Sequence, residues 1–292
     1  MKHLIKTVVL GILATLTIST ISCDKDEADA PSQKGGESLD SVMSIKSKIR
    51  EKVTYRGEDH SEKFKERWSY DKSRRDTLYE LFEDGSLIER NMNYSYTAEN
   101  GLYQQSYTRK LYLMGYQTAY LTETVTKTYK DSAMNNLLEE KHIGKKDSSR
   151  TTYRYNEAGL CENVSTYENG ELKLQRGNYS YNNKKSTFIE KYKSLDNWYT
   201  RAYVVEYANV YYTLVTCLSV YKGTSNDESE LYERTLYEYN SFGQTTKTEY
   251  YNGKSLGYSY TDFQYEGNKV TYKSKNYAED EDFTIVEILL DI

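Results

Sequence analysis

The sequence predicts an all-β protein, a repetitive antiparallel meander of β-hairpins that forms a long twisted sheet, open or partly curled toward a barrel. Three observations predict this class. The chain contains 33 Tyr among 292 residues, and aromatic side chains favour strands. Asn-Gly and Asp-Gly steps, which favour tight hairpin turns, separate the Tyr-rich segments. A third observation is an internal repeat with a period near 85 residues.

Tyrosine is the main source of apolar surface in this chain. Hydrophobic residues make up only 37% of the sequence, and 33 of them are Tyr, each with a large ring and a polar hydroxyl. Rings pair well across the strands of a sheet, so we expect a Tyr-filled sheet and not a thick aliphatic core. The single Pro, Pro31, lies outside the repeats, which suits strands whose N–H groups are all hydrogen-bonded.

The repeat is visible when turn and strand segments are aligned. Tyr155–Gly159 (YNEAG) matches Tyr239–Gly243 (YNSFG), and Tyr-x-Asn-Gly steps follow each of them at 167–170 and 250–253. In the first copy Tyr70-Asp71 is the matching segment, and Ser73-Arg74 lies near the position where the others have glycine. We place the copies at about 44–127, 128–213 and 214–292, within one repeat domain that covers residues 41–292.

Within each copy the local pattern is that of β-strands. Tyr-x-Tyr pairs such as Tyr153/Tyr155, Tyr179/Tyr181 and Tyr237/Tyr239 place two rings on one face, because strand side chains alternate. These recurring rings are expected to be structural. A short helix is expected at residues 40–50, and the aliphatic segment Phe283–Ile292 is expected to close the end of the sheet.

The N-terminus has the features of an export signal. A basic start with Lys2 and Lys6 precedes an apolar run, Val8–Ile21, that is too short to span a bilayer. Residues 1–22 are therefore predicted to be a signal peptide. The polar stretch after Cys23, up to residue 40, is predicted to be a flexible acidic tether.

Around Cys23 the sequence resembles the lipobox of bacterial lipoproteins of the Bacteroidota type. The resemblance implies acylation of Cys23, including palmitate, and attachment to a membrane through this N-terminal lipid. Lys25, Asp26 and Glu27 resemble the export tag that directs such lipoproteins to the exterior face of the outer membrane. The expected location is the outer membrane, lipid-anchored and facing the cell exterior.

The turn segments at 155–160 and 239–244, each followed by Tyr-x-Asn-Gly, resemble YD/RHS-type repeats of bacterial surface proteins. Residues 167–172 are also similar to MORN-like antitoxin repeats. These resemblances imply β-hairpin repeats and no particular activity.

Catalytic or metal-binding motifs are missing from the sequence. His60 and His142 lie in charged stretches and are expected to be surface residues, and the acidic run Glu279–Asp282 lacks the spacing of a calcium loop. Cys161 and Cys217 are expected to be unpaired, although a disulfide between them stays open. No cofactor or metal is expected, and the mature net charge of 37 − 44 = −7, after loss of Lys2 and Lys6, argues against nucleic acid as a partner.

The sequence therefore predicts a non-enzymatic binding or interaction module on the cell surface, with a glycan or a protein as ligand. Candidate contact residues are the aromatic ones that do not recur between copies: Trp198, Tyr199, Tyr203 and Tyr211. Two alternatives stay open. One is a carboxylate-based glycan hydrolase, which requires two acids facing each other across a concave cleft. The other is a toxin-immunity-like protein.

Overall fold

A computed structural model describes residues 48–56, 61–131, 134, 136–209, 214–277 and 283–291. The predicted signal peptide, Cys23, the export tag and the tether lie outside these residues. The described chain forms 18 β-strands and one short 3₁₀ helix, η1 (Glu228–Glu230).

Six strands fall in each sequence copy, apart from the last two residues of β6, which pass the first boundary. The first copy holds β1 (Lys48–Arg56), β2 (Ser61–Tyr70), β3 (Asp76–Glu83), β4 (Ser86–Glu99), β5 (Leu102–Tyr112) and β6 (Ala119–Tyr129). The second holds β7 (Leu137–Ile143), β8 (Ser148–Tyr155), β9 (Cys161–Glu168), β10 (Glu171–Asn182), β11 (Lys185–Ser194) and β12 (Asn197–Tyr207). The third holds β13 (Val215–Lys222), β14 (Leu231–Tyr239), β15 (Thr245–Asn252), β16 (Ser255–Glu266), β17 (Lys269–Asn276) and β18 (Thr284–Asp291).

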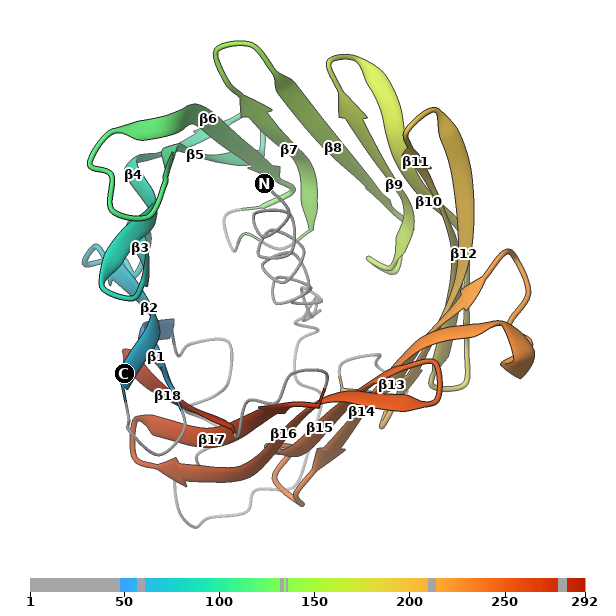
Figure 1. Cartoon of the computed structure of the whole chain (residues 1–292). Helices are drawn as coiled ribbons and strands as arrows, with labels where there is room; N and C mark the ends of the chain where they lie inside the picture. Colours follow the sequence, from blue (N-terminus) through green and yellow to red (C-terminus); the bar gives the residue numbers. More distant parts are fainter. Residues whose placement is uncertain are drawn as a thin grey trace, which may run out of the picture.

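The strands form a single antiparallel meander that closes into a barrel (Figure 1). The predicted all-β antiparallel meander is confirmed, but the expectation of an open or partly curled sheet is wrong. β18 pairs with β17 on one side and with β1 on the other, in a register that runs from Lys48↔Asp291 to Arg56↔Thr284. Closure leaves no free sheet edge among the described strands. The expected helix at residues 40–50 is also wrong at its end, because residues 48–50 belong to β1.

Each copy has a bulge at the same place, with a residue in the left-handed conformation. The registers of β4, β10 and β16 shift at Asn93, Asn178 and Asp262, whose φ angles are +58°, +54° and +56°. Asn and Asp tolerate this left-handed conformation better than other side chains. A bulge bends its strand and increases the local twist, which favours closure of a long sheet.

Tyrosine contacts repeat with the same geometry in all three copies. The ring centroids of Tyr94 and Tyr107 lie 4.8 Å apart, and the equivalent pairs Tyr179–Phe188 and Phe263–Tyr272 lie 4.9 and 4.8 Å apart. The barrel wall is one sheet thick, so these stacked pairs within the sheet do the packing that a core does in a layered protein.

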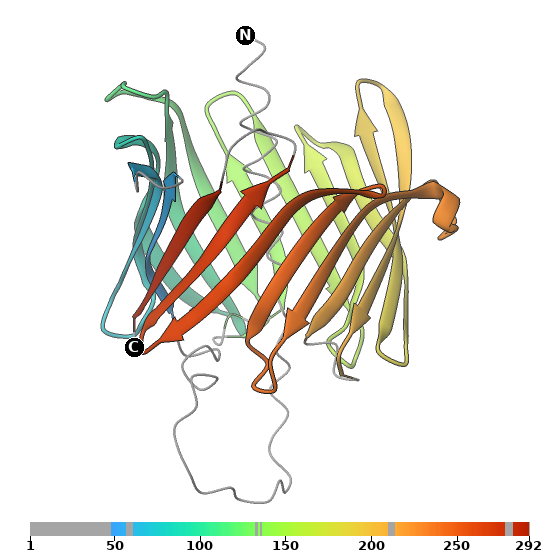
Figure 2. The same ribbon diagram turned by 60° about the horizontal axis from the view of Figure 1, so that its bottom comes forward.

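The two open ends of the barrel differ in what they carry. The terminal rim is defined by the start of β1 and the end of β18, and it includes the β2–β3, β8–β9 and β14–β15 hairpins. The distal rim is the opposite end, with the β5–β6 and β11–β12 hairpins and the β17–β18 connection. Figure 2 shows the C-terminal end at the lower rim and the β11–β12 hairpin at the upper one.

Candidate functional site

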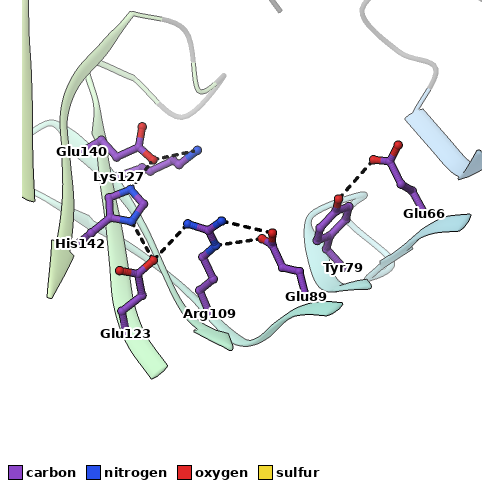
Figure 3. Close-up of polar contacts among 8 residues, drawn as sticks. All are labelled: Glu66, Tyr79, Glu89, Arg109, Glu123, Lys127, Glu140 and His142. Atoms are coloured by element: carbon purple, nitrogen blue, oxygen red, sulfur yellow. Dashed lines mark hydrogen bonds and ion pairs between the residues drawn. The ribbon is translucent and has the colours of Figure 1, made fainter. Parts of the chain in front are cut away.

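The inner face of the barrel carries rings and paired charges. Figure 3 shows Glu66, Tyr79, Glu89, Arg109 and His142 on the concave side of strands β2 to β7. Because side chains alternate along a strand, the residues directly before and after each of these in sequence point outward. In β6, for example, Glu123 points inward, so the threonines on either side of it point outward.

A chain of charged side chains, here named the His142 cluster, crosses four neighbouring strands on this inner face. Arg109 on β5 donates to Glu89 on β4 through Nε and Nη2, at 3.0 and 3.2 Å, and to Glu123 on β6 through Nη1 at 3.2 Å. His142 on β7 lies between two carboxylates: its Nδ1 is 3.1 Å from Oε1 of Glu123 and its Nε2 is 3.0 Å from Oε1 of Glu140.

Both ring nitrogens of His142 therefore face acceptors, and both can donate only when the imidazole is protonated. The hydrogen bond to Glu140 raises the pKa of His142, burial works against this, and the hydrogen bond to Glu123 adds to the increase. Burial pushes the pKa of Glu140 upward, but the hydrogen bond from His142 and the charge of Lys127, 3.5 Å away, outweigh it and lower that pKa. The arrangement favours the protonated form of His142.

This chemistry differs from that of a glycoside hydrolase. Glu123 and Glu140 lie on a concave surface, as the hydrolase alternative requires, but they share the same imidazole and pair with Arg109 and Lys127. A general acid needs a raised pKa, whereas that of Glu140 is lowered. Among the described residues, no three His, Cys, Asp or Glu side chains are grouped to hold a metal ion.

The expectation that His142 is a surface residue is wrong, and the reason is strand alternation. His142 is half-buried within β7, two residues from Glu140, so both point to the same face. The spacing of Glu140 and His142, two residues apart, is visible in the sequence and indicates that their side chains share a face. Arg109 and Glu123 come from other strands, and their meeting depends on the register between β5, β6 and β7. His60 lies outside the described residues.

The second copy has an ion pair on the inner face, between Arg176 and Glu190. Oε2 of Glu190 on β11 lies 2.7 Å from Nε of Arg176 on β10, and its Oε1 accepts from the Tyr203 hydroxyl at 3.0 Å. The Glu190 side chain is 5% exposed. Asn91 and Arg109 occupy the equivalent cross-strand position in the first copy. The register is thus conserved between copies while the side chains in it change.

The predicted contact residues do not form one surface. Tyr203 points inward and stacks on Phe188, with centroids 4.6 Å apart, and Tyr199 shares its face and stacks on Tyr192 at 5.5 Å. Trp198 lies on the opposite, outer face at the distal rim, and Tyr211 lies outside the described residues. Trp198 and Tyr199 are nevertheless neighbours at one rim, where they are 48% and 47% exposed.

The outer face of the barrel carries many charged and polar side chains, together with an apolar cluster of Ala202, Val204 and Tyr221 on β12 and β13. Arg150 pairs with Glu139, Arg67 with Glu51 and Arg154 with Glu162, and the Arg150 side chain is 56% exposed. The outward positions of β6 between Thr122 and Thr128 are all threonine. Cys161 and Cys217 are both free thiols. The predicted acidic run at 279–282 lies outside the described residues.

No helix in the described part of the chain has the length and apolar character needed to cross a membrane. No protein-family model matches the sequence, and no curated protein does. Among solved structures, the chain is similar to a porin-like protein from Bacteroides uniformis ATCC 8492, with 12% identity and a TM-score of 0.37. That comparison covers 83% of this chain and 96% of the other.

Proposed function

We propose that this protein is an outer-membrane lipoprotein, anchored through acylated Cys23 and facing the cell exterior, whose barrel is a non-enzymatic binding or interaction module. The signal-like N-terminus, the lipobox resemblance at Cys23 and the tag at Lys25, Asp26 and Glu27 support the anchor and its direction. The turn segments that resemble YD/RHS repeats of surface proteins agree with this setting.

The observation that carries the proposal is the outer face of the barrel. A barrel that spans a bilayer presents an apolar band about 25 Å tall to the lipid. Here the outward side chains include exposed ion pairs, such as Arg150–Glu139 and Arg67–Glu51, and the threonines of β6. Charged side chains on a lipid face are destabilising, so this barrel belongs in water and requires another means of membrane attachment. An acyl chain on Cys23 supplies it.

The contact surface in this proposal is formed by the exposed aromatic side chains of the distal rim, which include Trp198 and Tyr199. These are large, rigid contact groups. Many other rings contact one another within the inner face, as Tyr179 does with Phe188.

The test of the anchor uses cells that express the wild-type protein or Cys23→Ala and are fed an alkyne analogue of palmitate. Wild-type protein is expected to carry the label and to be digested by protease added to intact cells. The label should be lost in Cys23→Ala. An unlabelled wild-type protein would contradict lipid anchoring, and a labelled protein protected from protease would contradict exposure to the exterior.

A further inference from the structure

Exposed large apolar side chains gather at the distal rim. The described residues include eleven of them, and only Leu102 and Phe242 lie at the terminal rim. The other nine, 11 − 2, lie at the distal rim. Scattered exposed apolar residues are normal on a protein surface, but a concentration at one end marks a contact surface.

Eight of the nine come from the same hairpin position in each repeat, and the ninth, Ile143, lies at the end of β7, where the chain turns into β8. Leu113, Met114 and Tyr116 lie between β5 and β6, Leu195 and Trp198 lie at the β11–β12 hairpin, and Tyr277 follows β17. Figure 1 places β6, β12 and β17 far apart around the barrel. The rim therefore presents three separate apolar tips at one end of the molecule.

Leu195 is the clearest sign that the tips have a partner. It is 92% exposed and has a φ of +55°, in a two-residue turn with Asp196 at +69°. The Asp84-Gly85 and Asn169-Gly170 turns have Asp or Asn in this position, as their left-handed conformation favours. A leucine there is unfavourable in the turn and gains no burial within the chain, so a contact outside the chain accounts for it.

We infer that the distal rim rests on the interface of the lipid bilayer that holds the acyl chains of Cys23, an inference that rests on the proposed lipid anchor. Three tips spread around a rim suit a flat surface, whereas one extended ligand would reach only one or two of them. Trp and Tyr with Leu and Met are the side chains that favour the boundary between lipid and water.

The length of the N-terminal segment permits this orientation. Asp24 to Ser47 is 24 residues, and a chain of that length spans at most about 80 Å. The longest described strand has 14 residues, which corresponds to about 46 Å. Cys23 can therefore lie at the level of the distal rim even though β1 begins at the terminal rim.

The experiment uses the full lipidated protein reconstituted into phosphatidylcholine vesicles, with or without bromine on the acyl chains. The chain has two Trp, so subtracting the emission of Trp198→Phe from that of wild type isolates Trp198 without changing Trp68. Trp198 is expected to lose most of its emission in brominated vesicles and to be protected from iodide in the water.

Phe242, which is 62% exposed at the terminal rim, provides the matched control. A Trp placed there, as Phe242→Trp in the Trp198→Phe background, is expected to be quenched by iodide and unaffected by brominated lipid. Leu195→Asp, which suits the turn, should leave vesicle flotation intact and restore access of iodide to Trp198.

Flotation separates the two proposals. If the protein floats with the vesicles while Trp198 is open to iodide and insensitive to bromine, the rim inference is wrong and the anchor stands. If Trp198 becomes protected only on addition of a soluble glycan or protein, the rim has a different partner and the inference is wrong. A lipidated protein that does not float contradicts both.

Discussion

The hydroxyl of Tyr181 donates to the backbone carbonyl oxygen of Cys161 at 2.8 Å. The same bond, with the same length, joins Tyr96 to Asp76 in the first copy and Tyr265 to Thr245 in the third. A phenol that stacks on its neighbour and also donates to the start of the adjacent strand ties two neighbouring strands together. This contact explains how a chain poor in aliphatic residues can hold a wall one sheet thick.

Removing that hydroxyl tests its contribution. Tyr181→Phe keeps the ring and its stacking on Tyr179, and leaves a carbonyl oxygen without its side-chain donor. We expect the free energy of unfolding to fall by about 1 kcal/mol, measured from the midpoint of urea unfolding. Tyr120→Phe, at a position that is 61% exposed, is the control and should change little. Equal effects for both variants would contradict a structural role for the Tyr181 hydroxyl.

Stability should depend on pH through His142. Its hydrogen bonds to Glu140 and Glu123 raise its pKa above the ordinary value of about 6.5. The folded protein therefore binds this proton more tightly than the unfolded chain does. The resulting stabilisation is complete below about pH 6.5 and is lost as the pH rises through the raised pKa.

The measurement is the difference in unfolding free energy between wild type and His142→Gln across this range. The difference is expected to be largest in mild acid and to shrink toward alkaline pH. A difference that stays constant with pH would show that the imidazole is not protonated between the two carboxylates.

The ion pair of Glu190 should matter more than ion pairs on the outer face. Glu190→Ala leaves Arg176 without its buried carboxylate and Tyr203 without its acceptor, and should cost about 3 kcal/mol. The matched variant is Glu171→Ala, which removes an exposed carboxylate that pairs with Lys173 and Lys193. Exposed ion pairs often contribute nothing measurable to stability. We therefore expect Glu171→Ala to have the same midpoint of urea unfolding as the wild type.

Arg74 occupies a position that favours glycine. Its φ is +58°, where the equivalent Gly159 and Gly243 have +76° and +79°. Each of these turns is held by an Asp or Asn side chain, as Asp71 accepts from the backbone N–H of Arg75 at 2.9 Å. Arg74→Gly should raise the free energy of unfolding by up to about 1 kcal/mol. Gly243→Ala provides the reverse change and should lower it; an Arg74→Gly protein less stable than wild type would contradict this account.

The sequence pattern predicts the strands well because alternation and turn chemistry are local. Asn169-Gly170 and Tyr153/Tyr155 identify a turn and an inward face without knowledge of any other strand. Closure is different, since the contact between β1 and β18 joins residues from the two ends of the barrel. The bulges at Asn93, Asn178 and Asp262 that favour it recur as an Asn or Asp before an aromatic-x-Tyr step, but that local pattern does not specify how far the sheet curls.

The same limit applies to the site. Glu140 and His142 lie two residues apart, so their shared face follows from the sequence, but Glu123 and Arg109 reach them only through strand register. Trp198 and Tyr199 do not recur between copies, and alternation along β12 separates them onto opposite faces. Their place at a rim shared by three hairpins becomes visible only when the sheet has closed.

Membrane fractionation of a lipid-free protein tests the central claim most directly. Residues 1–23 are replaced by an ordinary cleavable signal peptide, so that the exported chain begins at Asp24 and carries no acyl group. A barrel with charged outer positions such as Arg150 and Arg67 should then leave the membrane fraction and appear folded in the soluble one. A lipid-free protein that remains integrated in the outer membrane would show that the barrel itself spans the bilayer, and would contradict the account.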